Sequence, residues 1–333
     1  MTGFILAGDA GGTKTLLALI PSVGRGRVGG PAALETYRSA DFPSLEAMIG
    51  AFRSRHPDPL VAVSIGFAGA VAGGRGVGTH VPWVADEREL ERLPGVPRAH
   101  VINDLVAAGY AIPALSAADL VTIIPGPGPG RPAPDGNAAI VSAGTGLGET
   151  ILVRHQGDLV PVPSEGGHAD FAPRTDPELE VFRALRAEHG RVSVERVLSG
   201  PGLVNVARVF HARDGAGDVM AGHMREAGPD ALPAAISGHA LAGTCASCAR
   251  SLDLLVGVYG AEAGNAALRG LARSGVYLGG GIPPRILPAL KSDTFRDAFL
   301  AKEPLRGLLE QVPVHVLMNE RASVIGAARF ATL

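Results

Sequence analysis

The chain has 333 residues, of which 46% are hydrophobic, so it can bury a sizeable core in one large domain or in two ordinary ones. Its 30 basic and 32 acidic side chains give a formal net charge of −2, which argues against nucleic acid or an anionic membrane surface as a partner. We expect small-molecule partners and, because the sequence has neither a signal-peptide pattern nor an apolar run of roughly 20 residues, a cytoplasmic protein with no membrane association.

The first third of the chain predicts alternating strands and helices. Apolar runs over 4–8 and 15–20 flank Gly11-Gly12, a pattern that predicts a β-hairpin with a tight turn. Three further elements are expected in chain order: a strand over 61–67, a strand over 99–103, and a helix over 104–112 that follows the second strand directly.

A proline- and glycine-rich stretch over 125–136 predicts a loop, because proline removes the N–H donors that helices and sheets require. After this loop, apolar runs over 138–142 and 149–154 flank the glycine-rich segment 144–148. The order of strand, glycine turn and strand at the N-terminus is thereby repeated. We expect an internally duplicated α/β unit.

The second half is predicted to be mostly helical. Residues 176 to about 273 show apolar residues at helical spacing, with Pro201 at a first-turn position. Strands over 275–278 and 312–317 and a terminal helix over 321–330 follow, and that helix is expected to pack onto the first domain. The predicted domains are a small α/β domain of residues 1–113 plus 314–333 and a larger α+β domain of residues 114–313.

Three glycine-rich segments are candidates for nucleotide binding. At Gly11-Gly12 the backbone N–H groups can approach phosphate oxygens, Thr13 adds a hydroxyl donor, and Asp9 could hold Mg²⁺ through water. The alternative is a hairpin whose glycines only supply the turn conformation. Gly144-Thr145-Gly146 fits a second phosphate turn, and Gly279-Gly280-Gly281 follows a strand where a base or ribose could lie on bare backbone.

Several polar side chains are candidates for catalysis or sugar binding. Asp104 begins a helix, so it is either an N-cap or a general base at the carboxyl end of a strand, with Asn103 beside it as a hydroxyl ligand. Glu165 and His168 flank two glycines and could converge on one small polar ligand. Glu195 near a helix start is typical of a surface glutamate.

Cys245 and Cys248 form a single C-x-x-C in an apolar, helix-like pattern. Two cysteines cannot close a tetrahedral zinc site without two further ligands, so we favour buried structural thiols over redox chemistry.

In combination these segments resemble the bacterial glucokinases, in the hexokinase branch of the actin-like ATPase superfamily. The densest similarity is SEGGHADFAP followed by RAEHGRVSVERVLSGPGLVN, residues 164–173 and 186–205. GDAGGT and SAGTGLG resemble the two phosphate segments of the family, VYLGGGIPPRIL its adenosine segment, and INDLVAAGYAIP the segment with its catalytic base.

The resemblance implies a two-domain actin-like ATPase (ribonuclease H-like) fold, with a cleft between a small α/β domain and a larger α+β domain. It implies Mg²⁺- and ATP-dependent phosphorylation of glucose at O6 and, usually, a homodimer. Asp104 is implied as the base, and the hydroxyls of the sugar are assigned to Asn103, Glu165, His168 and Glu195. Nucleotide binding is assigned to Gly8, Asp9, Ala10, Gly11, Gly12, Thr13, Gly144, Thr145, Gly146, Gly279, Gly280 and Gly281.

A few positions depart from the family pattern. Lys14-Thr15 is more similar to N-acetylhexosamine kinases, Ala70 stands where proline is common, and His80 takes the place of an asparagine. A kinase for another hexose or an N-acetylhexosamine therefore remains an alternative, as does a non-catalytic sugar sensor on the same fold. The zinc-binding cysteine cluster of the related ROK kinases is absent from the sequence.

Overall fold

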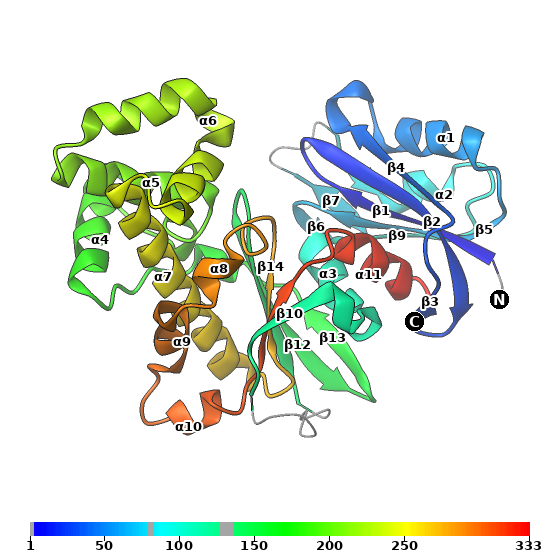
Figure 1. Ribbon diagram of the computed structural model, residues 1–333. Helices are drawn as coiled ribbons and strands as arrows, with labels where there is room; N and C mark the ends of the chain where they lie inside the picture. The colour runs from blue at the N-terminus through cyan, green and yellow to red at the C-terminus, as the bar shows by residue number, and fades with distance from the viewer. Residues whose placement is uncertain (1–2, 79–82, 127–135) are drawn as a thin grey trace. The chain divides into compact units, whose positions relative to one another are not determined.

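The computed structural model describes residues 3–78, 83–126 and 136–333, and Figure 1 labels the elements they form. Unit 1 contains Met1–Asp119, His155–Pro163 and Asn319–Leu333, and unit 2 contains Leu120–Arg154 and Ser164–Met318. The domain boundaries expected from the sequence, 113/114 and 313/314, stay a prediction. The compact units change at 119/120 and 318/319 instead, and unit 1 also takes in residues 155–163.

Unit 1 is built on a mixed sheet in which β1 has a central place. The strand order is β3-β2-β1-β5-β9, with β4 also paired to β2. The segment between β5 and β9 in the sequence forms a separate small sheet, β6-β7-β8. The elements are β1 (Gly3–Ala10), β2 (Lys14–Gly24), β3 (Arg27–Val28), β4 (Ala33–Arg38), α1 (Leu45–Arg55), β5 (Leu60–Phe67), β6 (Ala70–Ala72), β7 (Arg75–Val77), β8 (Ala85–Asp86), α2 (Glu87–Glu91), β9 (Ala99–Asn103), α3 (Asp104–Ala111), β13 (Asp158–Val162) and α11 (Ala322–Phe330), with short 3₁₀ turns at Ser39–Asp41, Ile112–Ala114 and Ala117–Asp119.

Helices cover both faces of this sheet, so its strands are apolar on both sides. Because side chains alternate along a strand, Leu6 of β1 packs in one cluster with α1, while Ile5 and Ala7 pack in another with α3 and α11. Figure 1 shows α3 and α11 next to each other, and the expected packing of the terminal helix onto the first part of the chain is confirmed. The functional consequence is that Asp9, next in the alternation after Ala7, faces α3 and α11.

Unit 2 combines a second mixed sheet with a group of helices. Its strands follow the order β10-β15-β14-β11-β12. Ser199 accepts a hydrogen bond from the N–H of Gly202 and so caps α5, with Pro201 in the first turn as predicted. The elements are β10 (Leu120–Ile124), β11 (Ala138–Ala143), β12 (Leu147–His155), α4 (Asp176–His189), α5 (Gly200–Arg213), α6 (Gly217–Leu241), α7 (Ala246–Gly270), β14 (Val276–Gly279), α8 (Leu287–Leu290), α9 (Asp293–Leu300), α10 (Arg306–Leu309) and β15 (Val314–Leu317), with 3₁₀ turns at Gly166–His168 and Val194–Arg196.

The two sheets share one pairing scheme, which confirms the internal duplication expected from the sequence. In unit 1, β1 pairs antiparallel with β2 across a glycine turn and parallel with β5, which pairs parallel with β9. In unit 2, β11 pairs antiparallel with β12 across the second glycine turn and parallel with β14, which pairs parallel with β15. Each glycine turn therefore sits at an equivalent edge of its sheet.

Among the described residues, no single helix is long and apolar enough to cross a membrane. Only α6 and α7 taken as a pair reach the length and hydropathy of a span, and they are bent by 102° relative to each other. Most of α7 is buried in the core of unit 2, which accounts for its apolar composition without a bilayer.

Candidate active site

A cavity of about 420 Å³ in unit 1 brings together several residues that the sequence singled out. The ends of β1, β5 and β9 lie at the same edge of the sheet, where ligands of open α/β sheets usually bind. The cavity is lined by Asp9, Gly11, Thr13, Lys14, Leu16, Leu34, Thr36, Ala68, Asp104, Glu320 and Arg321. Three carboxyl groups, those of Asp9, Asp104 and Glu320, and a glycine turn therefore share one pocket.

Asp9 is the penultimate residue of β1 and points to the α3 and α11 face of the sheet. Burial raises the pKa of its carboxyl, although a hydrogen bond from Ser323 of α11 and the charge of Lys14 oppose that shift. Its neighbours in the strand, Gly8 and Ala10, are both buried on the opposite face, against the core under α1. Of these three strand residues, it is thus Asp9 that lines the cavity.

Asp104 is the first residue of α3, and the structure corrects one of its two predicted roles. The N-cap is Asn103, whose side-chain oxygen accepts hydrogen bonds from the N–H groups of Leu105 (2.9 Å) and Val106 (3.2 Å). An Asn side chain that already caps the helix leaves the next carboxylate free to face the cavity. One oxygen of Asp104 accepts from the N–H of Leu105 at 2.9 Å, and the side chain of Asn103 also hydrogen-bonds the carboxyl.

The pKa of Asp104 is raised to about 6, first because the carboxyl is buried and second because the charge of Asp9 lies close by. A carboxyl with that pKa is ionised at neutral pH yet basic enough to accept a proton from a reacting hydroxyl. The electrostatics therefore fit a general base.

Ser39 braces the first glycine turn. Its hydroxyl donates to the carbonyl of Gly11 at 2.6 Å and lies 3.0 Å from the hydroxyl of Thr15, and its N–H donates to the carbonyl of Thr13 at 3.1 Å. These hydrogen bonds satisfy the carbonyl groups of Gly11 and Thr13 and hold the shape of the turn. No sequence motif marked Ser39, because it lies outside the hairpin that it stabilises.

The C-terminal helix α11 forms part of the surroundings of Asp104. Ser323 donates to the backbone carbonyl of Asp104 at 3.3 Å. At Gly326 an added Cβ would lie 1.7 Å from the carbonyl oxygen of Ala107, so α11 can approach α3 this closely only because position 326 is glycine. The position of the candidate base thus depends on residues about 220 positions further along the chain.

Glu195 has the corresponding bracing role in unit 2. Its Oε2 accepts a hydrogen bond from the N–H of Leu147 at 2.9 Å, directly after the second glycine turn. The turn is closed by the N–H of Gly144 donating to the carbonyl of Gly146 at 2.8 Å. Glu195 is only 30% exposed, so it is not the surface glutamate that its sequence context suggested.

His168 lies beside the same carboxylate. Its Nδ1 is 3.8 Å from Oε1 of Glu195, so one glutamate contacts both the glycine turn and a predicted sugar ligand. His168 and Glu165 are exposed at the two ends of the 3₁₀ turn Gly166–His168, where they can meet a ligand from solvent. Within unit 2 the structure therefore joins the second turn, Glu195 and His168.

The third glycine segment lies next to the second turn. β14 pairs parallel with β11, and after β14 the N–H of Ile282 donates to the carbonyl of Ala143 at 3.2 Å. Gly280 has φ 86, and a Cβ there would lie 2.2 Å from the carbonyl oxygen of Ala143. This close backbone contact is the reason for glycine at position 280.

Two of the positions that depart from the family pattern can be placed. Lys14 lines the cavity of unit 1, and Ala70 is exposed at the start of β6. His80 lies outside the described residues.

The comparisons with known proteins agree with this architecture. A crystal structure of a glucokinase from an Antarctic psychrotroph superposes with a TM-score of 0.85 at 30% identity, covering 99% of this chain and 98% of that one. A ROK family glucokinase from Streptomyces griseus, crystallised with glucose and AMPPNP, has the same fold, with a TM-score of 0.64 at 20% identity over 98% of this chain and 99% of that one.

The fold and the two glycine turns define a sugar kinase with the actin-like ATPase fold. A family model described as Glucokinase matches residues 6–333. A glucokinase from Nostoc punctiforme is 36% identical over 340 residues, covering 97% of this chain and 97% of the relative. The chain belongs to the glucokinase family.

Proposed function

We propose that this protein transfers the γ-phosphoryl group of ATP to O6 of glucose, with Asp104 as the general base. The products are ADP and glucose 6-phosphate. The observation that carries the proposal is the pair Asp9 and Asp104 in one cavity beside a glycine turn, with the pKa of Asp104 raised to about 6. Membership of the glucokinase family supports the choice of sugar and phosphoryl donor.

The two glycine turns are proposed to hold the phosphates through backbone N–H groups, and Gly279–Gly281 to hold the adenosine. Backbone donors in glycine turns bind anions without requiring a charged side chain. Asp9 fits a magnesium ion, because an anionic oxygen donor in a pocket with the hydroxyl of Thr13 is the ligand type that Mg²⁺ prefers. Bound there, Mg²⁺ would neutralise charge on the phosphates.

The sugar hydroxyls are assigned to Asn103, Glu165, His168 and Glu195. Asn103 already uses its oxygen to cap α3 and one N–H to reach the carbonyl of Gly69 at 3.1 Å, and its side chain also hydrogen-bonds Asp104, so a sugar oxygen would share or replace one of these contacts. Glu195 and His168 supply an acceptor and an imidazole from unit 2. Asn103 and Asp104 belong to unit 1, and Glu165, His168 and Glu195 belong to unit 2.

In the proposed reaction, Asp104 orients the O6 hydroxyl and takes its proton as O6 attacks the γ-phosphorus in line. The bond between that phosphorus and the β–γ bridging oxygen breaks, and ADP leaves with the electron pair. Positioning and electrostatic stabilisation supply most of the rate in such transfers. The base adds typically about 10²–10⁴-fold.

The test is sugar-dependent release of ADP from Mg·ATP, measured with glucose, mannose, fructose, N-acetylglucosamine and N-acetylmannosamine. We expect the highest kcat/KM with glucose and a loss of about 10²–10⁴-fold in kcat for Asp104→Asn. Asp58→Asn is the matched control, because Asp58 carries the same change in unit 1 outside the cavity lining, and it should leave kcat unchanged.

Three results would contradict parts of the proposal. An Asp104→Asn variant within a few-fold of the parent would exclude Asp104 as the base. A clear preference for another sugar would give the enzyme a different substrate. Saturable glucose binding with no turnover would indicate a sugar sensor.

Mg²⁺ dependence, a cytoplasmic location and a homodimer complete the proposal. ATP and glucose occur together in the cytoplasm, where the two free thiols would also remain reduced. Light scattering coupled to size-exclusion chromatography tests the dimer. A single peak at the 34.0 kDa of one chain would exclude it.

A further inference from the structure

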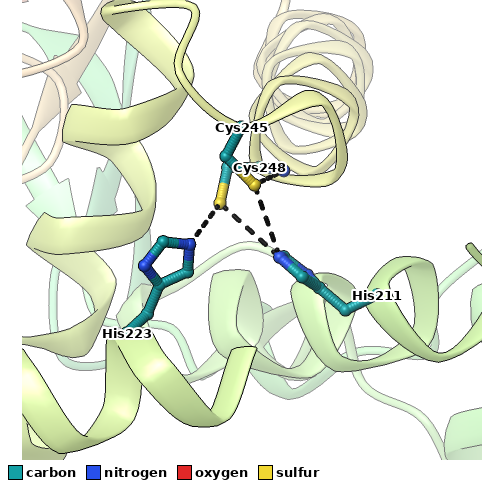
Figure 2. Close-up of side chains that lie close together, drawn as sticks. All are labelled: His211, His223, Cys245 and Cys248. Carbon is teal, nitrogen blue, oxygen red and sulfur yellow. Dashed lines mark hydrogen bonds between the residues drawn. The ribbon is translucent and has the colours of Figure 1, made fainter. Parts of the chain in front are cut away.

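Four metal-ligating side chains from three separate elements meet in unit 2, away from the residues assigned to sugar and nucleotide. His211 lies near the end of α5, His223 lies on α6, Cys245 is the N-cap of α7 and Cys248 lies in its first turn. Figure 2 shows the two imidazoles and the two sulfur atoms directed toward a common centre. One ligand atom of each residue lies within 4.8 Å of those of the other three.

The distances within this cluster are those of a zinc tetrahedron. Nε2 of His211 is 3.4 Å from Sγ of Cys245 and 3.8 Å from Sγ of Cys248, and Nε2 of His223 is 3.7 Å from Sγ of Cys248. Zn–S bonds of about 2.3 Å and Zn–N bonds of about 2.0–2.1 Å at tetrahedral angles give S···N edges of about 3.5 Å. The three S···N distances given above are close to that value, and the remaining ligand atoms lie within 4.8 Å of one another.

A hydrogen bond from Nδ1 of His211 leaves Nε2 of the same ring available to bind a metal. Nδ1 of His211 lies 2.7 Å from the carbonyl oxygen of Ala207 and must donate to it, because a carbonyl can only accept. In the neutral ring, Nε2 then carries a lone pair directed at both sulfur atoms. A backbone carbonyl on the second ring nitrogen is the usual arrangement for a zinc-bound histidine.

The N-terminus of α7 positions the first of the two cysteines. Sγ of Cys245 accepts a hydrogen bond from the N–H of Cys248 at 3.3 Å, as an N-cap oxygen would in other helices. Two thiolates and one divalent cation are together neutral, which suits a site in which His211, His223 and Cys248 are buried.

The structure also changes the interpretation of the C-x-x-C. The sequence suggested one continuous helix through both cysteines, but α6 ends at Leu241 and Cys245 lies in the connection before α7. The two histidines were missed because they lie 34 and 22 positions before Cys245 and on other helices. A redox role fits poorly, because Cys248 is 0% exposed and offers no access to a partner thiol.

We propose that His211, His223, Cys245 and Cys248 bind one Zn²⁺ in a structural Cys₂His₂ site. All four positions of the tetrahedron are filled by protein, so no position is left for water or substrate. The ion would connect α5, α6 and α7. It would fix in particular the first half of α6, which Gly228 separates from the second half with φ 73. The proposal does not depend on the proposed kinase activity.

The test begins with the full chain, purified without a histidine tag and passed over a desalting column after treatment with a weak chelator. Elemental analysis should find one zinc per chain. Replacement of zinc by cobalt should give the strong visible d–d bands of a tetrahedral site and a thiolate-to-cobalt charge-transfer band. This measurement on the parent protein needs no variant and is independent of activity.

Two ligand variants and one matched control locate the site. Cys248→Ala and His223→Gln should each lose the stoichiometric zinc, and removal of zinc from the parent with a strong chelator should lower its Tm. His239→Gln is the control, because the ring of His239 lies 4.2 Å from that of His223 but is not one of the four ligands, and it should retain one zinc.

Parent protein that contains no zinc and shows no tetrahedral cobalt spectrum would overturn the proposal. Loss of zinc in His239→Gln, or its retention in folded Cys248→Ala, would overturn the assignment of the ligands.

Discussion

Each unit has a carboxyl group of raised pKa near its glycine turn, and the two differ in their access to ligand. In unit 1, Asp104 and Asp9 line an open cavity of about 420 Å³, and burial together with mutual repulsion raises the pKa of Asp104 to about 6. In unit 2, burial and the charge of Glu262 raise the pKa of Glu149 to about 8, but Arg269 contacts both carboxyl groups, at 3.3 and 2.7 Å.

The comparison shows that a shifted pKa identifies a functional group only when the group also faces a ligand-sized space. Glu149 is 6% exposed and forms part of the interior, whereas Asp104 faces the cavity beside the turn. The two turns differ in a second way: the first is braced by the neutral hydroxyl of Ser39, and the second by the carboxylate of Glu195, which also contacts His168. Variants can test each difference.

The largest effect is expected for Gly280→Ala. The new Cβ would lie 2.2 Å from a backbone oxygen in a residue with φ 86, so neither a rotamer change nor a small shift relieves it. We expect the free energy of unfolding to fall by at least about 3 kcal/mol, together with weaker ATP binding. Gly144→Ala is the control, because its Cβ would meet its nearest atom at 3.9 Å. Urea unfolding of both variants measures the difference, and equal losses would contradict the prediction.

Asp104→Asn should stabilise the protein while it lowers kcat by about 10²–10⁴-fold. A carboxyl whose pKa is raised on folding contributes stability below its unfolded pKa and loses that contribution as pH rises through about 6. At pH 8 the ionised Asp104 therefore costs stability, and its removal should raise the free energy of unfolding by up to about 3 kcal/mol. The gain should disappear at pH 4, where Asp104 is protonated. A gain of equal size at both pH values would exclude this electrostatic cause.

The neighbouring carboxyl groups of Asp9 and Asp104 also predict how the reaction rate depends on pH. Because the base must be ionised, kcat/KM should rise with pH through about 6. Asp9→Asn removes the neighbouring charge, so the acid limb of its residual activity should shift to lower pH. An unchanged acid limb in this variant would show that Asp9 does not influence the titrating group.

Variants of Ser39 and Glu195, which hold the two glycine turns, should distinguish effects on ATP binding from effects on sugar binding. Ser39→Ala should raise KM for ATP alone. Glu195→Ala should raise KM for both ATP and glucose, because the N–H of Leu147 loses its acceptor. The expected increase in KM for Glu195→Ala is about tenfold, which corresponds to roughly 1–2 kcal/mol of binding free energy. Glu195→Gln keeps an acceptor oxygen and should affect glucose alone. Steady-state kinetics with each substrate varied in turn distinguish these patterns, and identical patterns for Ser39→Ala and Glu195→Ala would contradict them.

Glu149→Gln should have the smallest effect. Glu149 holds its proton at pH 7, and glutamine closely matches a protonated carboxyl, so kinetics and stability should be unchanged there. Above pH 8 the parent loses stability as Glu149 ionises, and the variant should be more stable by about 1 kcal/mol. Thermal unfolding at pH 7 and pH 9 measures this, and reduced activity at pH 7 would mean that Glu149 has a functional role after all.

Local patterns predicted much of the fold. The hairpin expected over 4–8 and 15–20 is β1 and β2, the strand over 99–103 is β9, and the helix over 104–112 is α3, which ends at Ala111. Each of these elements has a signal in consecutive residues: an apolar run, apolar residues at helical spacing, or a pair of glycines at a turn. The connection from β9 to α3 also placed Asp104 at a strand end, which is why a general base could be proposed from the sequence.

Contacts between distant residues were not predictable in this way. Ser39 reaches Thr15 across 24 positions, Glu195 reaches Leu147 across 48, and Cys245 reaches His211 across 34. None of these pairs has a characteristic spacing, because the tertiary packing brings them together. For the same reason the sequence placed the N-cap at Asp104, whereas Asn103 occupies that position once its amide reaches Gly69.

The contribution of α11 to unit 1 has a consequence for synthesis of the protein. Ser323 reaches Asp9 and Asp104, and Glu320 and Arg321 line the same cavity, although all three are translated more than 200 positions after Asp104. A nascent chain that lacks residues 319–333 has β1, β9 and α3 but not one wall of the pocket. On the ribosome, the glycine turn and Asp104 are made early, and their surroundings are completed only after α11 has also been made.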